Sequence, residues 1–142
     1  MISKQILVIE DDPQSLNLLQ WVLQGLGFQV HASQDFEDAA HFLTDHRPSL
    51  IISDLLGREP TTGVDFYLLH VMQKKIPFAL VSGTFFSASK VLPPKARFTP
   101  DAQNPHVGKI TLPDSNPESI QCFEKPFDVS DILQHFHLSP AA

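Results

Sequence analysis

The sequence predicts an α/β protein in which helices pack on both faces of a doubly wound, five-stranded parallel sheet. Two observations favour this fold class. Short apolar runs rich in β-branched residues alternate along the chain with segments whose apolar residues recur every three or four positions, and this alternation is typical of strands joined by helices. Right-handed crossovers between parallel strands then place the helices on both faces of the sheet.

The N-terminal part of the chain predicts a strand followed by a helix. Residues 6–9 form a continuous apolar run, which is typical of a buried strand in a parallel sheet. Asp12 can cap the helix, and Pro13 suits its first position because an N–H there has no helical partner. Gly25 and Gly27 are candidates to end the helix. Leucines at three- and four-residue spacing predict that the helix packs on the sheet, namely Leu16, Leu19, Leu23 and Leu26.

The same patterns predict the remaining elements in order. Apolar runs predict strands at residues 28–32, 49–54, 77–83 and 120–127. Amphipathic segments predict helices at residues 35–46, after Gly63, and at residues 128–138. The last helix is short because Pro140 follows it. We expect residues 1–142 to form one domain, since the length and the 42% apolar content suit a single core.

The stretch between the fourth and fifth predicted strands is too long for one helix and two short loops, which need roughly 20 residues. It holds six of the twelve prolines, at positions 93, 94, 100, 105, 113 and 117. Because proline breaks helices, we expect a proline-rich insertion at about residues 84–119 to replace or modify the fourth helix. Residues 95–99 and 107–112 either pair as a small hairpin or belong to an irregular, partly disordered loop.

Composition and charge argue against several classes of function. The net charge of −6 argues against nucleic acid or an anionic membrane surface as the main partner. Cys122 is the only cysteine, so neither an intrachain disulfide nor a thiolate metal cage can form. No apolar stretch approaches the roughly 20 residues of a membrane span, and the N-terminus lacks the apolar stretch of a signal peptide. We therefore expect a cytoplasmic protein.

Polar side chains stand at the ends of four predicted strands. Glu10 and Asp11 follow the first strand, Asp54 ends the third, Ser82 ends the fourth and Lys125 ends the fifth. Ligands of open parallel sheets bind beyond the carboxyl ends of the strands, so we expect these side chains to meet at one edge. Carboxylates gathered there would repel one another, and a hard cation such as Mg²⁺ relieves that repulsion while taking oxygen ligands.

Four motifs at these strand ends, VIEDD, IISDL, LVSG and EKPF, together resemble the receiver domain of bacterial two-component response regulators. This CheY-like domain has a flavodoxin-like sheet of five parallel strands. The resemblance extends from Gln5 to about Leu138. Each motif is common by itself, but the set stands in the order of the family and each member lies at a strand end.

The resemblance implies a role for each residue of the set. It implies that Asp54 accepts a phosphoryl group from a histidine kinase or a phosphotransfer protein, giving an aspartyl phosphate. It implies that Mg²⁺ is held by Asp11, by Asp54, by Glu10 through water, and by the main-chain carbonyl of Leu56.

The resemblance further implies that Ser82 is the switch hydroxyl, which bonds a phosphoryl oxygen, and that Lys125 forms an ion pair with the phosphate. The Lys125–Pro126 peptide is a candidate for the cis form. Such a domain is a signalling module and not an enzyme, and it acts on a downstream protein, without direct nucleic-acid or membrane binding. The insertion is a candidate partner-binding or homodimer surface.

The sequence departs from the family pattern in its output region. The family usually carries an aromatic switch residue three positions before the lysine, where this chain has Cys122, with Phe123 as a candidate substitute. These departures keep open an alternative, a receiver-like interaction module whose output is independent of phosphorylation. A magnesium-dependent phosphohydrolase is a third reading, but apolar Leu56, two residues beyond Asp54, cannot orient an attacking water. We therefore expect slow self-dephosphorylation.

Overall fold

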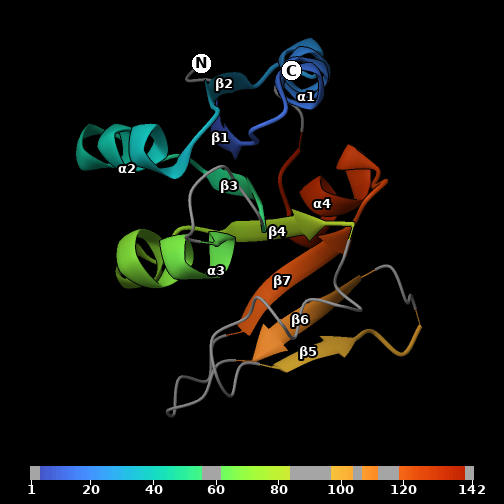
Figure 1. Ribbon diagram of the computed structural model, residues 1–142. Coiled ribbons are helices and arrows are strands. Elements are labelled where there is room, and N and C mark those ends of the chain that lie inside the picture. The colour runs from blue at the N-terminus through green and yellow to red at the C-terminus, as the bar shows by residue number, and fades with distance from the viewer. Residues whose placement is uncertain (1–3, 56–61, 84–96, 104–106, 112–118, 140–142) are drawn as a thin grey trace.

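The computed structural model describes residues 4–55, 62–83, 97–103, 107–111 and 119–139. Its strands form one sheet in the order β2-β1-β3-β4-β7-β6-β5. Five strands are parallel, namely β1 (Gln5–Ile9), β2 (Gln29–Ser33), β3 (Leu50–Asp54), β4 (Phe78–Ser82) and β7 (Ser119–Glu124). These are the five predicted strands, and the predicted α/β fold class is therefore confirmed. Two antiparallel strands extend the predicted sheet beyond β7 (Figure 1).

The helices lie on both faces of the sheet, as right-handed crossovers require (Figure 1). They are α1 (Pro13–Gly25), α2 (Phe36–Asp45), α3 (Gly63–Phe66) and α4 (Val129–His135). One buried cluster joins the sheet to α2 and α3, and a second joins it to α1 and α4. No helix in the described part of the chain is long and apolar enough to cross a membrane.

Helix starts follow the capping residues in the sequence. The side chain of Asp12 accepts a hydrogen bond of 3.0 Å from the backbone N–H of Ser15, and Pro13 occupies the first turn of α1. Asp35 caps α2 in the same way, through the N–H of Asp38 at 2.7 Å. Each cap satisfies a backbone donor that the first helical turn leaves unpaired.

The helix predicted after Gly63 is only partly α-helical. After α3 the backbone continues as a π-helical turn, η1 (Tyr67–Val71), and then as a 3₁₀ turn, η2 (Met72–Lys74). The apolar spacing of the sequence did not indicate this change of helix type. In the π turn Tyr67 and Val71 are both buried, while Leu69 between them is exposed.

The insertion forms a hairpin where the structure describes it. Strands β5 (Arg97–Pro100) and β6 (Val107–Thr111) pair antiparallel, and β6 pairs antiparallel with β7. Of the two readings left open by the sequence, the hairpin is therefore correct. A Cβ atom at Gly108 would lie 2.6 Å from the carbonyl oxygen of Thr99, so glycine is needed for this close pairing. The described residues between β4 and β7 contain no helix.

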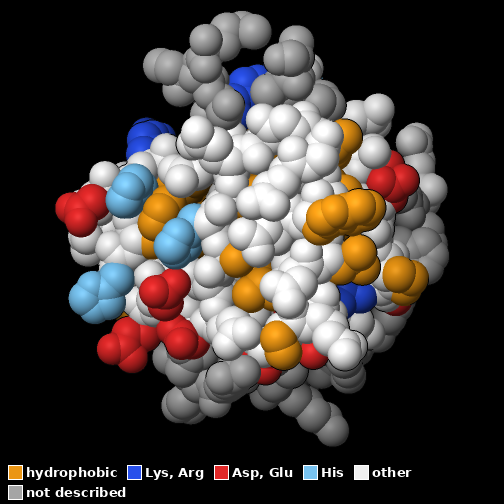
Figure 2. Space-filling view, turned by 90° about the horizontal axis from the view of Figure 1, so that it is seen from above, with side chains coloured by type: hydrophobic (Ala, Val, Ile, Leu, Met, Phe, Trp, Pro, Cys, Tyr) orange, Lys and Arg blue, Asp and Glu red, His pale blue; other side chains and the backbone are white. Residues whose placement is uncertain are grey.

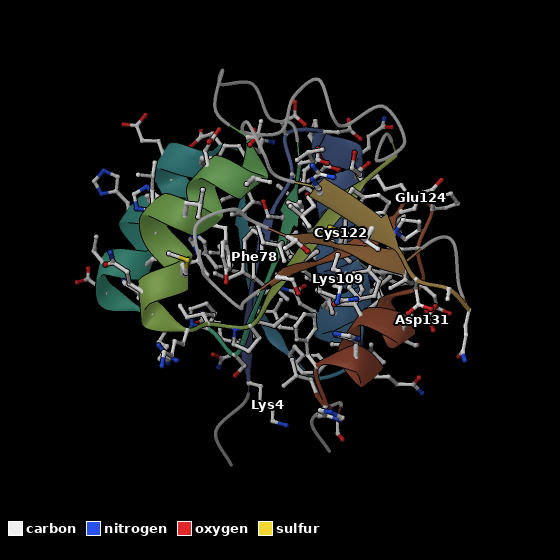
Figure 3. The ribbon with its side chains drawn as sticks, turned by 90° about the horizontal axis from the view of Figure 1, so that it is seen from below. Lys4, Phe78, Lys109, Cys122, Glu124 and Asp131 are labelled. Atoms are coloured by element: carbon white, nitrogen blue, oxygen red, sulfur yellow. The ribbon has the colours of Figure 1, made fainter. Side chains whose placement is uncertain are left out.

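The hairpin turns β7 into an interior strand. Without β5 and β6, β7 would be the edge of the sheet; here β4 pairs with one side of it and β6 with the other. Figure 3 shows Cys122 of β7 in the interior of the molecule, with Glu124 and Asp131 toward its periphery. The last helix, α4, has seven residues and lies within the predicted range 128–138, but ends before that range does.

Candidate functional site

The ends of the central parallel strands bring the predicted site residues to one edge of the sheet. Strands β1 and β3 are neighbours with Ile9 opposite Ser53, so Glu10 and Asp54 follow paired positions. The backbone N–H of Lys125 donates a 3.0 Å hydrogen bond to the carbonyl of Ser82. This bond holds the end of β7 beside the end of β4.

Three carboxylates gather at this edge. Glu10, Asp11 and Asp54 each offer one oxygen atom, and these atoms all lie within 4.8 Å of one another. No second group of three such metal-ligating residues occurs in the part of the chain that the structure describes. An all-oxygen, carboxylate-rich set of this kind suits a hard divalent cation such as Mg²⁺.

The ammonium group of Lys125 faces two of these carboxylates. Its Nζ atom lies 2.8 Å from Glu10 Oε1 and 3.3 Å from Asp54 Oδ1. The side chains of Glu10 and Asp54 are only 9% and 15% exposed, whereas that of Lys125 is 33% exposed. Lys125 brings one positive charge to a cluster of three acids, so the negative charge of the cluster is incompletely balanced and favours a further cation.

The three ionisable groups shift one another's pKa. Burial raises the pKa of the Asp54 carboxyl to about 7; Lys125 opposes this rise, and the neighbouring Glu10 carboxylate adds to it. Burial would also raise the pKa of Glu10, but the hydrogen bond and charge of Lys125 lower it below its usual range. The pKa of Lys125 is raised, because its carboxylate partners outweigh its burial.

Ser82 is buried at the carboxyl end of β4, one residue beyond Val81, which pairs with Asp54. A Cβ atom at Gly83 would meet no other atom within 4 Å, so the space beside Ser82 is open. The Lys125–Pro126 peptide is cis, as the resemblance implied. Leu56, whose carbonyl the resemblance placed among the metal ligands, lies outside the described residues.

Cys122 and Phe123 point to opposite faces of the sheet, as successive strand residues must. Cys122 is fully buried on the α2 and α3 face, where burial raises the pKa of its thiol. Phe123 is buried on the α1 and α4 face and makes an edge contact with the ring of His135, at a centroid distance of 5.8 Å. An aromatic side chain at residue 122 would lie on the face of α2 and α3. Phe123 lies on the opposite face and therefore does not take its place.

Sequence reasoning missed two features beside the site. A Cβ atom at Gly63 would lie 2.5 Å from the carbonyl oxygen of Asp54, so α3 begins in direct contact with the end of β3. The backbone N–H of Gly63 also donates a 2.7 Å hydrogen bond to the carbonyl of Leu55. The sequence indicated Gly63 only as a helix start. The second feature is a groove beside α1 that ends at Glu10 and Lys125; no sequence motif signals it.

Comparison with known proteins supports the receiver resemblance at the level of the fold. The sequence matches no protein-family model and no curated protein. Among solved structures, a response regulator receiver protein from Sinorhizobium medicae matches with a TM-score of 0.66 and 16% identity, over 95% of this chain and 92% of that chain. The chemotaxis protein CheY4 of Vibrio cholerae matches with a TM-score of 0.65 and 17% identity, over 96% of this chain and 98% of that chain.

A third similar structure is the anti-anti-sigma factor PhyR of Bartonella quintana, with a TM-score of 0.64 and 19% identity. That match covers 96% of this chain but 48% of PhyR. The matched proteins thus include isolated receiver domains and a longer protein. Together they show that this chain has the CheY-like receiver fold.

Proposed function

We propose that this chain, whose fold is that of a receiver domain, accepts a phosphoryl group on Asp54 and signals through protein contacts. The observation that carries the proposal is the meeting of Glu10, Asp11 and Asp54 with Lys125 at one edge of the sheet. Asp54 and Lys125 are far from Glu10 and Asp11 in sequence, and burial of several carboxylates together is costly. An edge built in this way suits a reaction that brings in both a cation and a phosphoryl group.

In the proposed reaction, a carboxylate oxygen of Asp54 attacks the phosphorus of a phosphohistidine on the donor protein. The new P–O bond forms as the P–N bond breaks, and the donor imidazole leaves and takes up a proton. Asp54 must be ionised to attack, and in the metal-free protein, where its pKa is about 7, the carboxylate form predominates only above neutral pH. Lys125 lies where its charge can balance that of the phosphoryl oxygens.

Mg²⁺ fits the donor set that the structure provides. Glu10, Asp11 and Asp54 would hold it, with the carbonyl of Leu56 as a further proposed ligand. The cation, when bound, neutralises charge on the transferring group. Ser82 is the proposed switch hydroxyl, since it ends the strand beside Asp54 and is tied to Lys125 by a backbone hydrogen bond.

The proposed partners are a histidine kinase or phosphotransfer protein as donor and a second protein as the recipient of the signal. We propose a single cytoplasmic signalling domain and not an enzyme. The net charge of −6 supports protein partners over nucleic acid.

Mass spectrometry of the intact protein tests the proposal. After incubation with acetyl phosphate and Mg²⁺, we expect one phosphate adduct on the wild-type protein and none on Asp54→Asn. Asp12→Asn is the matched control, because Asp12 is an exposed helix cap and asparagine also caps helices. A phosphate adduct on Asp54→Asn would contradict the proposal. So would the absence of an adduct on the wild type under conditions in which acetyl phosphate modifies another receiver domain.

A second candidate, a receiver-like interaction module that signals without phosphate, is favoured by the buried Cys122 and by the strands that cover β7. NMR spectra with and without fluoroberyllate and Mg²⁺ separate the two. Chemical-shift changes far from Asp54 favour the phosphorylation-dependent reading. Chemical-shift changes confined to the site, together with partner binding that is unaffected by fluoroberyllate, favour the phosphate-independent module.

A further inference from the structure

The strands of the insertion give the end of the sheet one buried face and one polar face. Along β5, β6 and β7, buried or half-buried side chains alternate with more exposed ones. Phe98, Ile110 and Ile120 belong to the cluster that joins the sheet to α2 and α3. Successive strand residues point to opposite faces, so their neighbours share the other face. We call these six side chains the hairpin face, namely Arg97, Thr99, Lys109, Thr111, Ser119 and Gln121.

The strand register arranges the hairpin face as two rows across the three strands. The rows are Arg97–Thr111–Ser119 and Thr99–Lys109–Gln121. Both charged residues of the face, Arg97 and Lys109, are exposed. They stand on neighbouring antiparallel strands as diagonal neighbours, whose Cβ atoms lie about 7–8 Å apart. The register therefore brings two cations together on a surface that is open to solvent.

The hairpin face carries two positive charges and no negative one. Neither Arg97 nor Lys109 forms an ion pair with another residue that the structure describes. Asp101 follows β5 directly, but its carboxylate accepts a 2.7 Å hydrogen bond from the backbone N–H of Gln103. The two cations are therefore available to an anionic group from outside the chain.

The negative charge of the molecule lies elsewhere. Acidic and histidine side chains gather over α2 (Figure 2), which packs near β1 and β2, at the opposite end of the sheet from β5. Three further acids meet at the carboxyl ends of β1 and β3. An approaching acidic chain is repelled by these regions and attracted by the hairpin face. Charge thus favours both an acidic partner and this place of contact.

The spacing of the two cations suits an extended acidic segment of a protein. In an extended chain, side chains two positions apart point to the same side and are separated by about 6.6–6.8 Å. Two carboxylates at alternate positions therefore match the diagonal of Arg97 and Lys109. The hydroxyl and amide groups of the face can donate hydrogen bonds to the remaining oxygen atoms. Nucleic acid is a poorer match, because its affinity grows with the number of phosphates neutralised and this face offers two cations.

We propose that the hairpin face binds an extended acidic segment of a partner protein, with carboxylates at alternate positions held by Arg97 and Lys109. The proposal goes beyond the expectation that the insertion is a partner or homodimer surface, because it names the contact residues and the charge of the partner. It does not require phosphorylation of Asp54. The experiment below leaves that residue unchanged, so either proposal can fail while the other stands.

Fluorescence anisotropy of a fluorescein-labelled peptide that alternates threonine and glutamate tests the proposal. We expect the full chain to bind this peptide with half-saturation below about 1 mM, the range of weak complexes. Binding should weaken as the salt concentration is raised from about 0.1 M to about 1 M, because the Debye length falls from about 10 Å to about 3 Å. A peptide with glutamine in place of glutamate should bind at least about tenfold more weakly.

Paired variants locate the binding. Arg97→Gln combined with Lys109→Gln should weaken binding by about tenfold. The matched control combines Lys4→Gln with Lys75→Gln, which removes the same charge at two exposed positions outside the hairpin face. Figure 3 shows Lys4 well away from Lys109. The control should bind as the wild type does, and far-UV circular dichroism confirms that both double variants fold.

Several results would overturn the proposal. They are a wild-type chain that does not bind the acidic peptide, equal binding of the glutamine peptide, and binding that does not respond to salt. Equal losses in the two double variants would also overturn it, because net charge and not the hairpin face would then be responsible. A single-stranded oligonucleotide that binds more tightly than the peptide, and loses its binding in the Arg97 and Lys109 variant, would replace the acidic protein with nucleic acid.

Discussion

The Lys125 side chain donates a 2.8 Å hydrogen bond to Glu10 Oε1 and so joins two residues that are 115 positions apart in the sequence. Glu10 is almost fully buried, and Lys125 is its cationic partner in the described structure. The pair connects the end of the first strand to the end of the last. It therefore fixes the two sides of the carboxylate cluster relative to each other.

Replacing Lys125 with methionine should destabilise the metal-free protein. The substitution leaves Glu10 buried beside Asp54 without its cation, and breaking a buried pair costs about 3–5 kcal/mol. Because Lys125 is one-third exposed, we expect a smaller loss of about 2 kcal/mol in urea unfolding at pH 8. Lys109→Met, at an exposed position of β6, is the control and should change stability by less than about 0.5 kcal/mol. Equal effects of the two substitutions would show that the buried pair contributes nothing.

Asp54 should make the stability of the metal-free protein depend on pH. Its pKa is about 7 when folded and 3.8 as a free model group, so the folded state holds the proton more tightly. The stabilisation that comes from holding this proton is fully present below pH 3.8 and is lost as the pH rises through 7. Asp54→Asn does not ionise, and should be more stable than wild type at pH 8 by up to about 4 kcal/mol, at about 1.4 kcal/mol per pKa unit.

The measurement is urea unfolding of both proteins in a chelator at pH 5 and pH 8. The difference between them should shrink at the lower pH, where wild-type Asp54 is protonated in the folded state. A difference that is the same at both pH values would mean that the Asp54 carboxyl does not titrate in this range.

Mg²⁺ should stabilise the folded protein through the carboxylate cluster. Binding to the folded state alone raises the free energy of unfolding by about 1.4 kcal/mol when the free Mg²⁺ concentration is ten times the Kd. Asp11→Asn should lose most of this gain, because Asp11 supplies one of the three clustered oxygens. Asp12→Asn should keep it. Thermal unfolding with and without Mg²⁺ measures the stabilisation of each variant. Equal stabilisation of the two variants would show that Asp11 does not bind the metal.

Gly63 should be intolerant of a side chain. A Cβ atom there would lie 2.5 Å from the Asp54 carbonyl oxygen and 2.6 Å from Leu80 Cδ1, so backbone and core must move, at a cost of about 1–3 kcal/mol. Gly25→Ala is the matched control, because a Cβ atom at Gly25 meets nothing within 4 Å. It should be neutral or stabilising by up to about 1 kcal/mol. Chemical denaturation of the two variants tests this, and similar stabilities would contradict the close approach.

The five parallel strands and the meeting of the acids were predictable from the sequence for a general reason. The carboxyl ends of parallel strands lie at the same edge of a sheet, whatever the details of packing. Glu10, Asp11 and Asp54 stand at such ends, so their proximity followed once the strands were identified. The capping aspartates of α1 and α2 were likewise local signals, because a cap acts within one helical turn.

The sequence by itself determined the parallel core and which carboxylates share its edge, because apolar periodicity and strand polarity are local properties. Only the tertiary structure decided that the insertion forms a hairpin on β7, that Cys122 faces the layer of α2 and α3 while Phe123 faces that of α1 and α4, and that a groove remains beside α1. Each of these depends on contacts between segments far apart in the chain, and such contacts leave no periodic pattern in either segment. The free energy that selects them comes from the fit of surfaces that meet only after folding.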